Sequence, residues 1–422
     1  MSGAVPTPRS PLPALYGLGF VAFVAMTLPM FCMPYVAKDF GLGDEGITFL
    51  MGVISVGSLG TFALTRLADR RGRRRTMLLS FAGLSPLSLA TALSPGAAFF
   101  AAAQMGALAL HSTLRMVTTV AITELADEGR RARAQAWLGF VSGMGGAVPM
   151  IVVASLGDRP GGWRYGFGAL AAALLAWPWV RARAPETGRF DRAQALGVTD
   201  KARAGDLFRG AYRRRATGLL LAAMLRGAGL IGLGHWTFYH GVHGLGLSGW
   251  VVTAIFMVGG TPGMLGLPAG ALLAERWGRR PTFLLGLALE LSGGIAFYLL
   301  TPTSQTQAIL QLGAAFFVYN FGSQCHSVAD RLVDTELFPT ALRATYAGMR
   351  TIAEAVAAIA SHFTLSALIV GVGALPHAIT FLSLATVLPS AGLFLWAASE
   401  TRGLSLEAAS LEAPPPSPPE AR

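Results

Sequence analysis

One basic phrase occurs twice in this chain, and each copy stands between two long apolar segments. The copies occupy residues 67–74 and 273–280, a displacement of 206 residues. Two further pairs of markers follow in the same order: Glu124-Leu125 with Glu336-Leu337, and Pro185-Glu186-Thr187 with Ser399-Glu400-Thr401. Three paired markers in one order predict a duplicated half, and the flanking apolar segments indicate that the duplicated unit is a bundle of membrane helices.

The composition supports a membrane protein, because 53% of the 422 residues are hydrophobic and only 13% are charged. A helix needs roughly 20 apolar residues to cross the hydrocarbon core. Apolar runs of that length occur at about 14–36, 46–65, 77–94, 98–122, 135–156, 164–181, 216–240, 250–272, 282–300, 307–334, 344–370 and 375–398. The sequence therefore predicts an all-α integral membrane protein with twelve transmembrane helices in two pseudo-symmetric six-helix bundles.

The distribution of positive charge predicts the orientation. If the amino terminus is cytoplasmic, only Lys38, Arg159 and Arg164 of the 33 Lys and Arg residues fall in predicted outer segments. This is a strong positive-inside bias. The formal net charge of +11 therefore indicates topology and contact with the lipid bilayer rather than a nucleic-acid partner. We expect a protein of the cytoplasmic membrane with both termini in the cytoplasm.

The apolar pattern also predicts the domain boundaries. Residues 182–215 are rich in cationic side chains and are expected to form a cytoplasmic linker. The linker separates an amino-terminal bundle, residues 1–181, from a carboxy-terminal bundle, residues 216–400. Residues 401–422 are expected to form a cytoplasmic tail, partly disordered, because its last part is rich in proline.

The duplicated markers resemble those of a known family. Residues 67–74 resemble the signature loop of the major facilitator superfamily, and residues 273–280 are its expected echo. Residues 336–343 and 400–407 are similar to the branch of sugar porters and metabolite-proton symporters. The resemblance implies the major facilitator fold, a monomer that works by alternating access, and a cavity at the bundle interface lined by helices one, four, seven and ten.

Charged residues at the ends of the predicted helices form a candidate gating latch. A carboxylate beside arginines from a neighbouring helix can make charge-assisted hydrogen bonds that hold one conformational state and separate in another. Asp69 and Glu275 are the expected latch acids. The remaining latch candidates are Arg70, Arg73, Glu124, Arg131, Arg276, Arg279, Glu336 and Arg343.

Polar residues within the apolar runs are candidates for substrate binding, because an ionisable group in the bilayer is costly without a partner or a cavity. Arg115 is the first candidate, since its planar guanidinium suits a carboxylate. It follows Gln104 and His111 at helical spacing on the fourth predicted helix. Further candidates are Arg226, Asn320 and Gln324. Structural partnering is the alternative role for each of these side chains.

Acids within the apolar runs are candidates for proton coupling. The first helix has no acid between Tyr16 and Tyr35, so a proton carrier must lie elsewhere, and Asp330 and Glu354 are the best placed. An ion pair between Arg350 and Glu354, four residues apart, is the alternative role for that acid. Glu290 has no evident partner in the sequence.

No catalytic, metal-ligating or nucleotide-binding motif is present, so neither an enzyme nor a cofactor is expected. We expect a secondary active transporter for a small organic metabolite, with an organic anion favoured over other classes and protons as the coupling ion in symport. A drug-proton antiporter is the nearest alternative, and facilitated diffusion is another. A membrane sensor or scaffold without transport activity is a further one.

Overall fold

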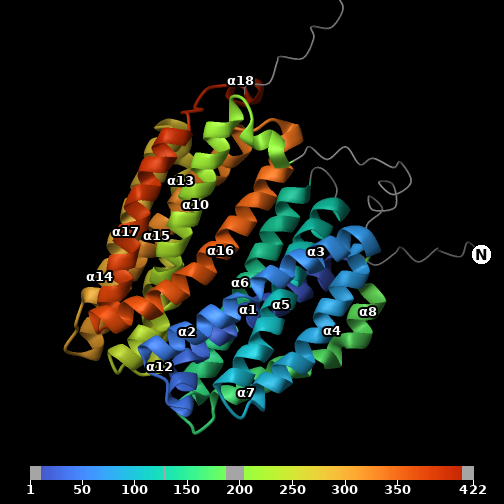
Figure 1. The fold of residues 1–422 in the computed structure, drawn as a ribbon. Helices are drawn as coiled ribbons and strands as arrows, with labels where there is room; N and C mark the ends of the chain where they lie inside the picture. The colour runs from blue at the N-terminus through green and yellow to red at the C-terminus, as the bar shows by residue number, and fades with distance from the viewer. Residues whose placement is uncertain (1–10, 127–129, 187–203, 411–422) are drawn as a thin grey trace, which may run out of the picture. The chain divides into compact units, whose positions relative to one another are not determined.

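The computed structural model of the chain describes residues 11–126, 130–186 and 204–410. The regular secondary structure of these residues is entirely helical, and the chain forms two compact units, residues 1–199 and 200–422 (Figure 1). Much of the predicted linker and the end of the predicted tail, residues 187–203 and 411–422, lie outside the described residues. The predicted boundaries of the two bundles therefore stay predictions.

The amino-terminal unit consists of α-helices joined by short turns. They are α1 (Leu12–Phe40), α2 (Asp44–Ser55), α3 (Ser58–Arg71), α4 (Arg73–Ala92), α5 (Ala97–Leu125), α6 (Arg131–Leu156), α7 (Trp163–Ala171), the short 3-10 helix η2 (Ala172–Ala176) and α8 (Trp177–Arg183). Helices α2 and α3 are two parts of one traverse, separated at Gly57. A Cβ atom on Gly57 would lie 2.1 Å from the carbonyl oxygen of Met105, so glycine is needed for the close approach to α5.

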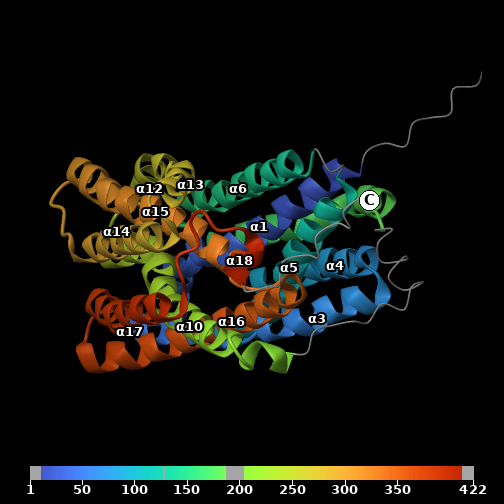
Figure 2. The same cartoon turned by 90° about the horizontal axis from the view of Figure 1, so that it is seen from above.

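The carboxy-terminal unit repeats this plan. Its elements are η3 (Ala204–Phe208), α10 (Tyr212–His235), α11 (Thr237–Tyr239), the π-helical turn η4 (His240–Gly244), α12 (Gly249–Gly263), α13 (Gly266–Arg276), α14 (Arg279–Leu299), α15 (Gln305–Glu336), α16 (Thr340–Val372), α17 (Leu375–Ala397) and α18 (Leu406–Ser410). Helices α12, α13, α14 and α15 pack together, as Figure 2 shows from above.

Nine helical spans in the described part of the chain are long and apolar enough to cross a membrane. They match nine of the twelve predicted runs. The other three runs are also helical but more polar or interrupted: α4 begins with three arginines, α15 carries amides and acids, and the run at 164–181 is divided among α7, η2 and α8. The predicted all-α membrane fold is confirmed, with apolar spans found for nine of its twelve helices.

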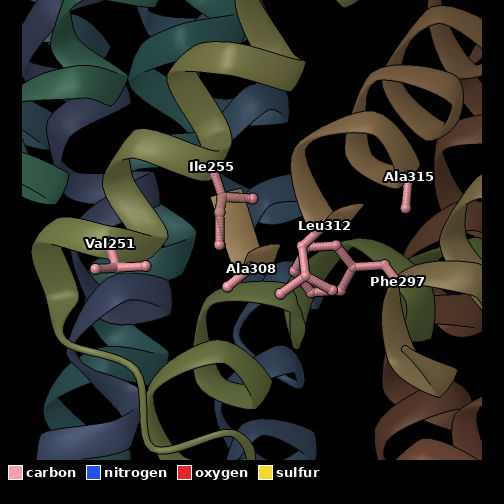
Figure 3. Close-up of a cluster of buried hydrophobic side chains, with 6 residues drawn as sticks. All are labelled: Val251, Ile255, Phe297, Ala308, Leu312 and Ala315. Carbon is pink, nitrogen blue, oxygen red and sulfur yellow. The ribbon is translucent and has the colours of Figure 1, made fainter. Parts of the chain in front are cut away.

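Apolar side chains lie both between the helices and on the outer surface. One buried cluster joins α12, α14 and α15 (Figure 3); it consists of Val251, Ile255, Phe297, Ala308, Leu312 and Ala315. Elsewhere large apolar side chains are exposed, for example Leu175 at 85% and Val370 at 76%. A soluble protein rarely exposes so many large apolar side chains, whereas a lipid bilayer solvates them.

Candidate functional site

Each basic loop turns at a glycine whose backbone other residues do not adopt. Gly72 has φ +93° and ψ +152°, and Gly278 has φ +109° and ψ +167°. A Cβ atom would lie 2.6 Å from the carboxylate of Glu186 at the first site and 2.7 Å from that of Glu400 at the second. Glycine is therefore favoured at each loop for two reasons: it can adopt this backbone conformation, and it leaves room for the carboxylate.

The two acids cap the helices that begin at these turns. Glu186 accepts hydrogen bonds from the backbone N–H groups of Arg73, at 2.9 Å, and Arg74, at 3.3 Å. Glu400 accepts the equivalent bonds from Arg279, at 2.9 Å, and Arg280, at 3.0 Å. A carboxylate at a helix amino terminus satisfies orphan donors and interacts favourably with the helix dipole.

The cap in the carboxy-terminal unit changes the acidity of its carboxylate. Burial acts to raise the pKa of Glu400, but the N–H donors of Arg279, Arg280, Arg402 and Thr401 outweigh burial and lower it. The anionic form of Glu400 is therefore the form that the folded state prefers. The capping hydrogen bonds that Glu186 and Glu400 accept explain why the third repeated marker of the sequence, residues 185–187 and 399–401, accompanies the basic loops.

Four of the latch candidates form two ion pairs, each within one unit. Arg73 forms an ion pair with Glu124. Arg279 donates to both carboxylate oxygens of Glu336, at 3.2 and 2.9 Å, in a two-point contact. Each pair joins two helices of the same unit, α4 to α5 and α14 to α15.

The other latch candidates occupy different positions. Arg343 donates to the carbonyl oxygen of Phe338 at 2.9 Å, so it closes its own turn. Glu275 and Arg276 are exposed at the end of α13. The side chains of Asp69, Arg70 and Arg131 lie outside the described residues.

The polar stripe of α5 is divided between buried and exposed positions. Gln104 is buried and donates to the hydroxyl of Thr91 on α4 at 2.8 Å. His111 is also buried, and its Nδ1 atom has no hydrogen-bond partner. Arg115 is exposed. Among the stripe residues named from the sequence, Arg115 is therefore the exposed one.

The polar stripe of α15 contacts the neighbouring helices of its own unit. Asn320 donates to the carbonyl oxygen of Gly260 on α12 at 2.7 Å. The amide nitrogen of Gln324 lies 3.2 Å from the sulfur of Met264. Both side chains are half-buried, so each keeps part of its surface accessible.

A network of charged side chains lies within the carboxy-terminal unit and joins three of its helices. Arg226 on α10 donates to Asp330 on α15 at 2.7 Å. Arg350 on α16 pairs with Asp330 and with Asp334. It also donates to Glu354 at 2.9 Å, which confirms the predicted pairing. We call these five residues the charge network.

The charge network contains one more acid than base. Its three carboxylates and two guanidiniums sum to −1 when all are ionised. Asp330, between both arginines, is 6% exposed, whereas the side chain of Glu354 is 49% exposed. The hydroxyl of Tyr346 donates a further hydrogen bond to the carboxylate of Asp334, at 3.1 Å. Buried charges are tolerated in this way, by pairing and by hydrogen bonds.

The pair of Glu290 and His326 was not predicted from the sequence. The carboxylate of Glu290 on α14 lies 2.8 Å from Nδ1 of His326 on α15. The signal available in the sequence was a single acid in the middle of an apolar run, which predicts a buried partner without identifying it. In the part of the chain that the structure describes, no group of three or more His, Cys, Asp or Glu side chains is placed to hold a metal ion.

Comparison with known proteins identifies the family. Residues 15–362 match the Major Facilitator Superfamily. A stretch of 160 residues, 34% of this chain, is 31% identical to solute carrier family 22 member 18 of Rattus norvegicus and spans 38% of that relative's length.

The fold is similar to that of several solved transporters at low sequence identity. The inward-open xylose transporter XylE from E. coli has a TM-score of 0.68 and 18% identity, covering 95% of this chain and 98% of that one. A POT family transporter in complex with 5-aminolevulinic acid has a TM-score of 0.69 and 15% identity, covering 94% and 97%. The match over residues 15–362 shows that the chain belongs to the Major Facilitator Superfamily, and the solved structures show that it has the fold of membrane transporters.

Proposed function

We propose that this transporter moves a small organic anion in symport with protons, by alternating access. We place it in the cytoplasmic membrane, as a monomer with both termini in the cytoplasm. The positive-inside distribution of Lys and Arg supports that orientation.

The charge network is the observation that carries proton coupling. Ionisable side chains inside a membrane-spanning bundle cost several kcal/mol, and such residues mark ion or proton pathways. With three acids against two arginines, the network can accept one proton and become neutral overall. Asp330 and Glu354 are the proposed coupling acids within it, because the first lies at its centre and the second is half-exposed at its edge.

Arg115 supports the preference for an anion. Arg115 is exposed on the long apolar span of α5, and its planar guanidinium has the geometry to contact a carboxylate at two points. Gln104 and His111, which are buried on the same helix, are the proposed accessory contacts of Arg115. Within the carboxy-terminal unit, the half-buried Asn320 and Gln324 of α15 are proposed separately as substrate contacts. Arg226 donates a hydrogen bond to Asp330, so we propose that it contacts substrate only after that hydrogen bond breaks.

Uptake into proteoliposomes tests this proposal. Labelled carboxylates, sugars and organic cations would be offered with and without an imposed pH gradient. We expect accumulation of a carboxylate when the outside is more acidic, and loss of that accumulation when the gradient is collapsed by an ionophore.

The alternatives give different results in the same assay. Expulsion of an organic cation against entering protons would identify a drug-proton antiporter. Movement that ignores the pH gradient would refute proton coupling. If no labelled compound moves, although the reconstituted protein is folded and correctly inserted, the sensor or scaffold role is favoured.

A further inference from the structure

A groove lies on the surface of the amino-terminal unit, between α4 and the segment formed by α7, η2 and α8. Its volume is about 690 Å³, and apolar side chains and one serine, Ser85, line it. Leu175 is 85% exposed, so the groove opens onto a surface that hydrocarbon solvates better than water. The large or rigid lining residues are Pro86 and Leu89 on α4, and Leu174, Leu175, Trp177 and Pro178 on the other side.

Packing fixes the two sides of the groove. Phe81 of α4 stacks on Trp177 of α8, with ring centroids 6.4 Å apart. Farther from this contact, the side opposite α4 tightens into the 3-10 turn η2, which is narrower than an α-helix. The lining residues Ala82 and Ala171 have short side chains. The narrow backbone and the short side chains leave space between two helices that Phe81 and Trp177 hold together.

One end of the groove is strongly basic. Three arginines begin α4 at residues 73–75, and α8 ends at Arg183. Arg74 joins the two helix ends, because it donates to the carbonyl oxygens of Arg181 and Ala184, each at 2.8 Å. Arg75 and Arg181 therefore lie at the same end of the groove, and both are exposed.

Helical spacing places Arg75 on the face of α4 that lines the groove. Arg75, Ala82, Pro86 and Leu89 recur at i, i+7, i+11 and i+14, which lie on one face of a helix. The helix rises about 10 Å from Arg75 to Ala82 and about 21 Å from Arg75 to Leu89. Half of the hydrocarbon core is about 15 Å thick. The groove therefore begins within the depth of one leaflet when Arg75 lies at the headgroup level.

The other side of the groove also ends in arginine and tryptophan. Arg181 follows the lining residue Trp177 by one helical turn. The guanidinium of Arg183 lies over the ring of Trp179, 5.3 Å from its centroid. Tryptophan is enriched where a membrane meets water, so this end of the groove fits the headgroup region.

The basic end keeps a positive charge after its acids are counted. Glu124 pairs with Arg73, so these two charges cancel. Glu186, which caps α4, is the other acid in contact with this end among the described residues. It stands against four guanidiniums, those of Arg74, Arg75, Arg181 and Arg183. The end therefore carries an excess of three positive charges and favours an anionic ligand.

The internal repeat shows that the helix frame does not require these charges. In the carboxy-terminal unit, Arg280 donates to the carbonyl oxygen of Leu395 at 2.8 Å, just as Arg74 donates to that of Arg181. The loop copies are displaced by 206 residues, and the cap markers, from residue 185 to residue 399, by 214 residues. By these displacements, Arg75, Arg181 and Arg183 correspond to the uncharged Pro281, Leu395 and Ala397. The backbone contact is kept in both units, whereas the additional arginines accompany the groove of one unit.

We propose that this groove and its arginines bind an anionic phospholipid of the leaflet beside the basic loops. The phosphate lies between Arg75 and Arg181, and one acyl chain lies in the groove along α4. The arginines select an anionic over a zwitterionic headgroup, because cationic side chains near the surface attract anionic lipids. The apolar lining selects a lipid over a soluble anion. This inference goes beyond the proposed transport and depends neither on the substrate nor on the coupling ion.

Native mass spectrometry of the purified full chain tests the site. The probes are phosphatidylglycerol and phosphatidylcholine with identical acyl chains, each titrated into delipidated protein in a neutral detergent. We expect one phosphatidylglycerol to bind in preference to phosphatidylcholine. Arg75→Gln and Arg181→Gln should each weaken phosphatidylglycerol binding about fivefold, and together about 25-fold, without changing phosphatidylcholine binding.

Two further variants separate a lipid site from general charge attraction. The double variant Arg213→Gln with Arg214→Gln removes two exposed arginines of the other unit, where Arg214 lies 5.7 Å from the ring centroid of Trp396. It makes the same change in net charge and should keep the wild-type affinity. Ala82→Phe fills the groove and leaves the arginines in place, so it should abolish the preferred phosphatidylglycerol site. Unfolding midpoints near that of the wild type would show that these variants are folded.

Several results would overturn the inference. Equal binding of the two lipids, or an equal loss in the control double variant, would reduce the effect to non-specific attraction. Displacement of phosphatidylglycerol by inorganic phosphate, but not by chloride at the same ionic strength, would assign the arginines to a soluble anion. If the glutamine variants fail to fold, Ala82→Phe decides alone, because unchanged phosphatidylglycerol binding in that variant refutes the groove.

Discussion

Substitution of Gly278 by alanine tests the double requirement for glycine at the basic loop. With φ +109° and ψ +167°, this residue occupies a region that is essentially restricted to glycine. Alanine there costs about 1–3 kcal/mol in backbone strain. The new methyl group would also lie 2.7 Å from the carboxylate of Glu400 and would displace the cap of α14. Loss of a helix cap costs about 0.5–2 kcal/mol.

The structure supplies a matched control at Gly403. This residue also has a positive φ, +76°, but a Cβ atom there would meet nothing within 4 Å. Gly403→Ala should therefore cost only the strain of a left-handed residue, about 1–2 kcal/mol. Gly278→Ala should cost about 1.5–5 kcal/mol in total, since displacement of the cap adds to the strain.

The chain carries its own reporter for the measurement. Its two cysteines, Cys32 and Cys325, are fully buried, one in each unit. A thiol-reactive fluorophore should label them only on unfolding, so labelling during a thermal ramp gives an unfolding midpoint. Gly278→Ala should lower the midpoint clearly more than Gly403→Ala. Equal shifts would refute the contribution of the cap, as would an unchanged cost of Gly278→Ala in a Glu400→Ala background.

Four further predictions follow from the charged groups. Asp330→Asn should destabilise the protein by about 3 kcal/mol, because two buried arginines would lose a carboxylate that balances their charge. Glu354→Gln should cost under about 1 kcal/mol, and thermal unfolding of the two variants measures the difference. Arg115→Lys should weaken binding of anionic more than neutral ligands, measured by uptake competition; equal loss would indicate a structural arginine. Glu275→Gln should shift the balance of inward- and outward-open states, measured by labelling of introduced cysteines from each side; unchanged labelling would remove Glu275 from the latch. The pKa of Glu400 is lower in the folded than in the unfolded protein, so this residue stabilises the fold above the ordinary glutamate pKa of about 4.3. As the pH falls through and below that value, the wild type should lose this stabilisation, whereas Glu400→Gln should show no such loss.

Much of the fold was predictable because it depends on local properties of the sequence. Apolar runs long enough to span a bilayer predict helices wherever they occur, since each span must satisfy its own backbone hydrogen bonds. The duplicated markers then predicted two similar halves. The helix breaks at Gly57 and within the run at 164–181 were not predicted. The break at Gly57 lies at a close approach to Met105 on α5, which spacing does not reveal.

The candidate site was predicted less completely. The pairing of Arg350 with Glu354 followed from helical spacing, because residues four apart lie on one face. The contacts of Arg350 with Asp330 and of Glu290 with His326 join different helices. They could not be predicted, because residue spacing does not show which helices lie next to each other. The stripe of α5 shows the same limit. Spacing placed Gln104, His111 and Arg115 together, but only packing decides which of them is buried.

The distribution of these features between the two units indicates what each of them does. The glycine turn, the acid cap and the arginine ion pair occur in both units, at Gly72 and Gly278 and the residues around them. A feature that both bundles retain serves what both must do, which is to fix the ends of their helices at the membrane surface. The charge network and the pair of Glu290 and His326 lie in the carboxy-terminal unit alone among the described residues. Under the proposed proton symport, ionisable side chains embedded in one bundle suffice for coupling, so we assign coupling to the charge network and a structural role to the repeated loops.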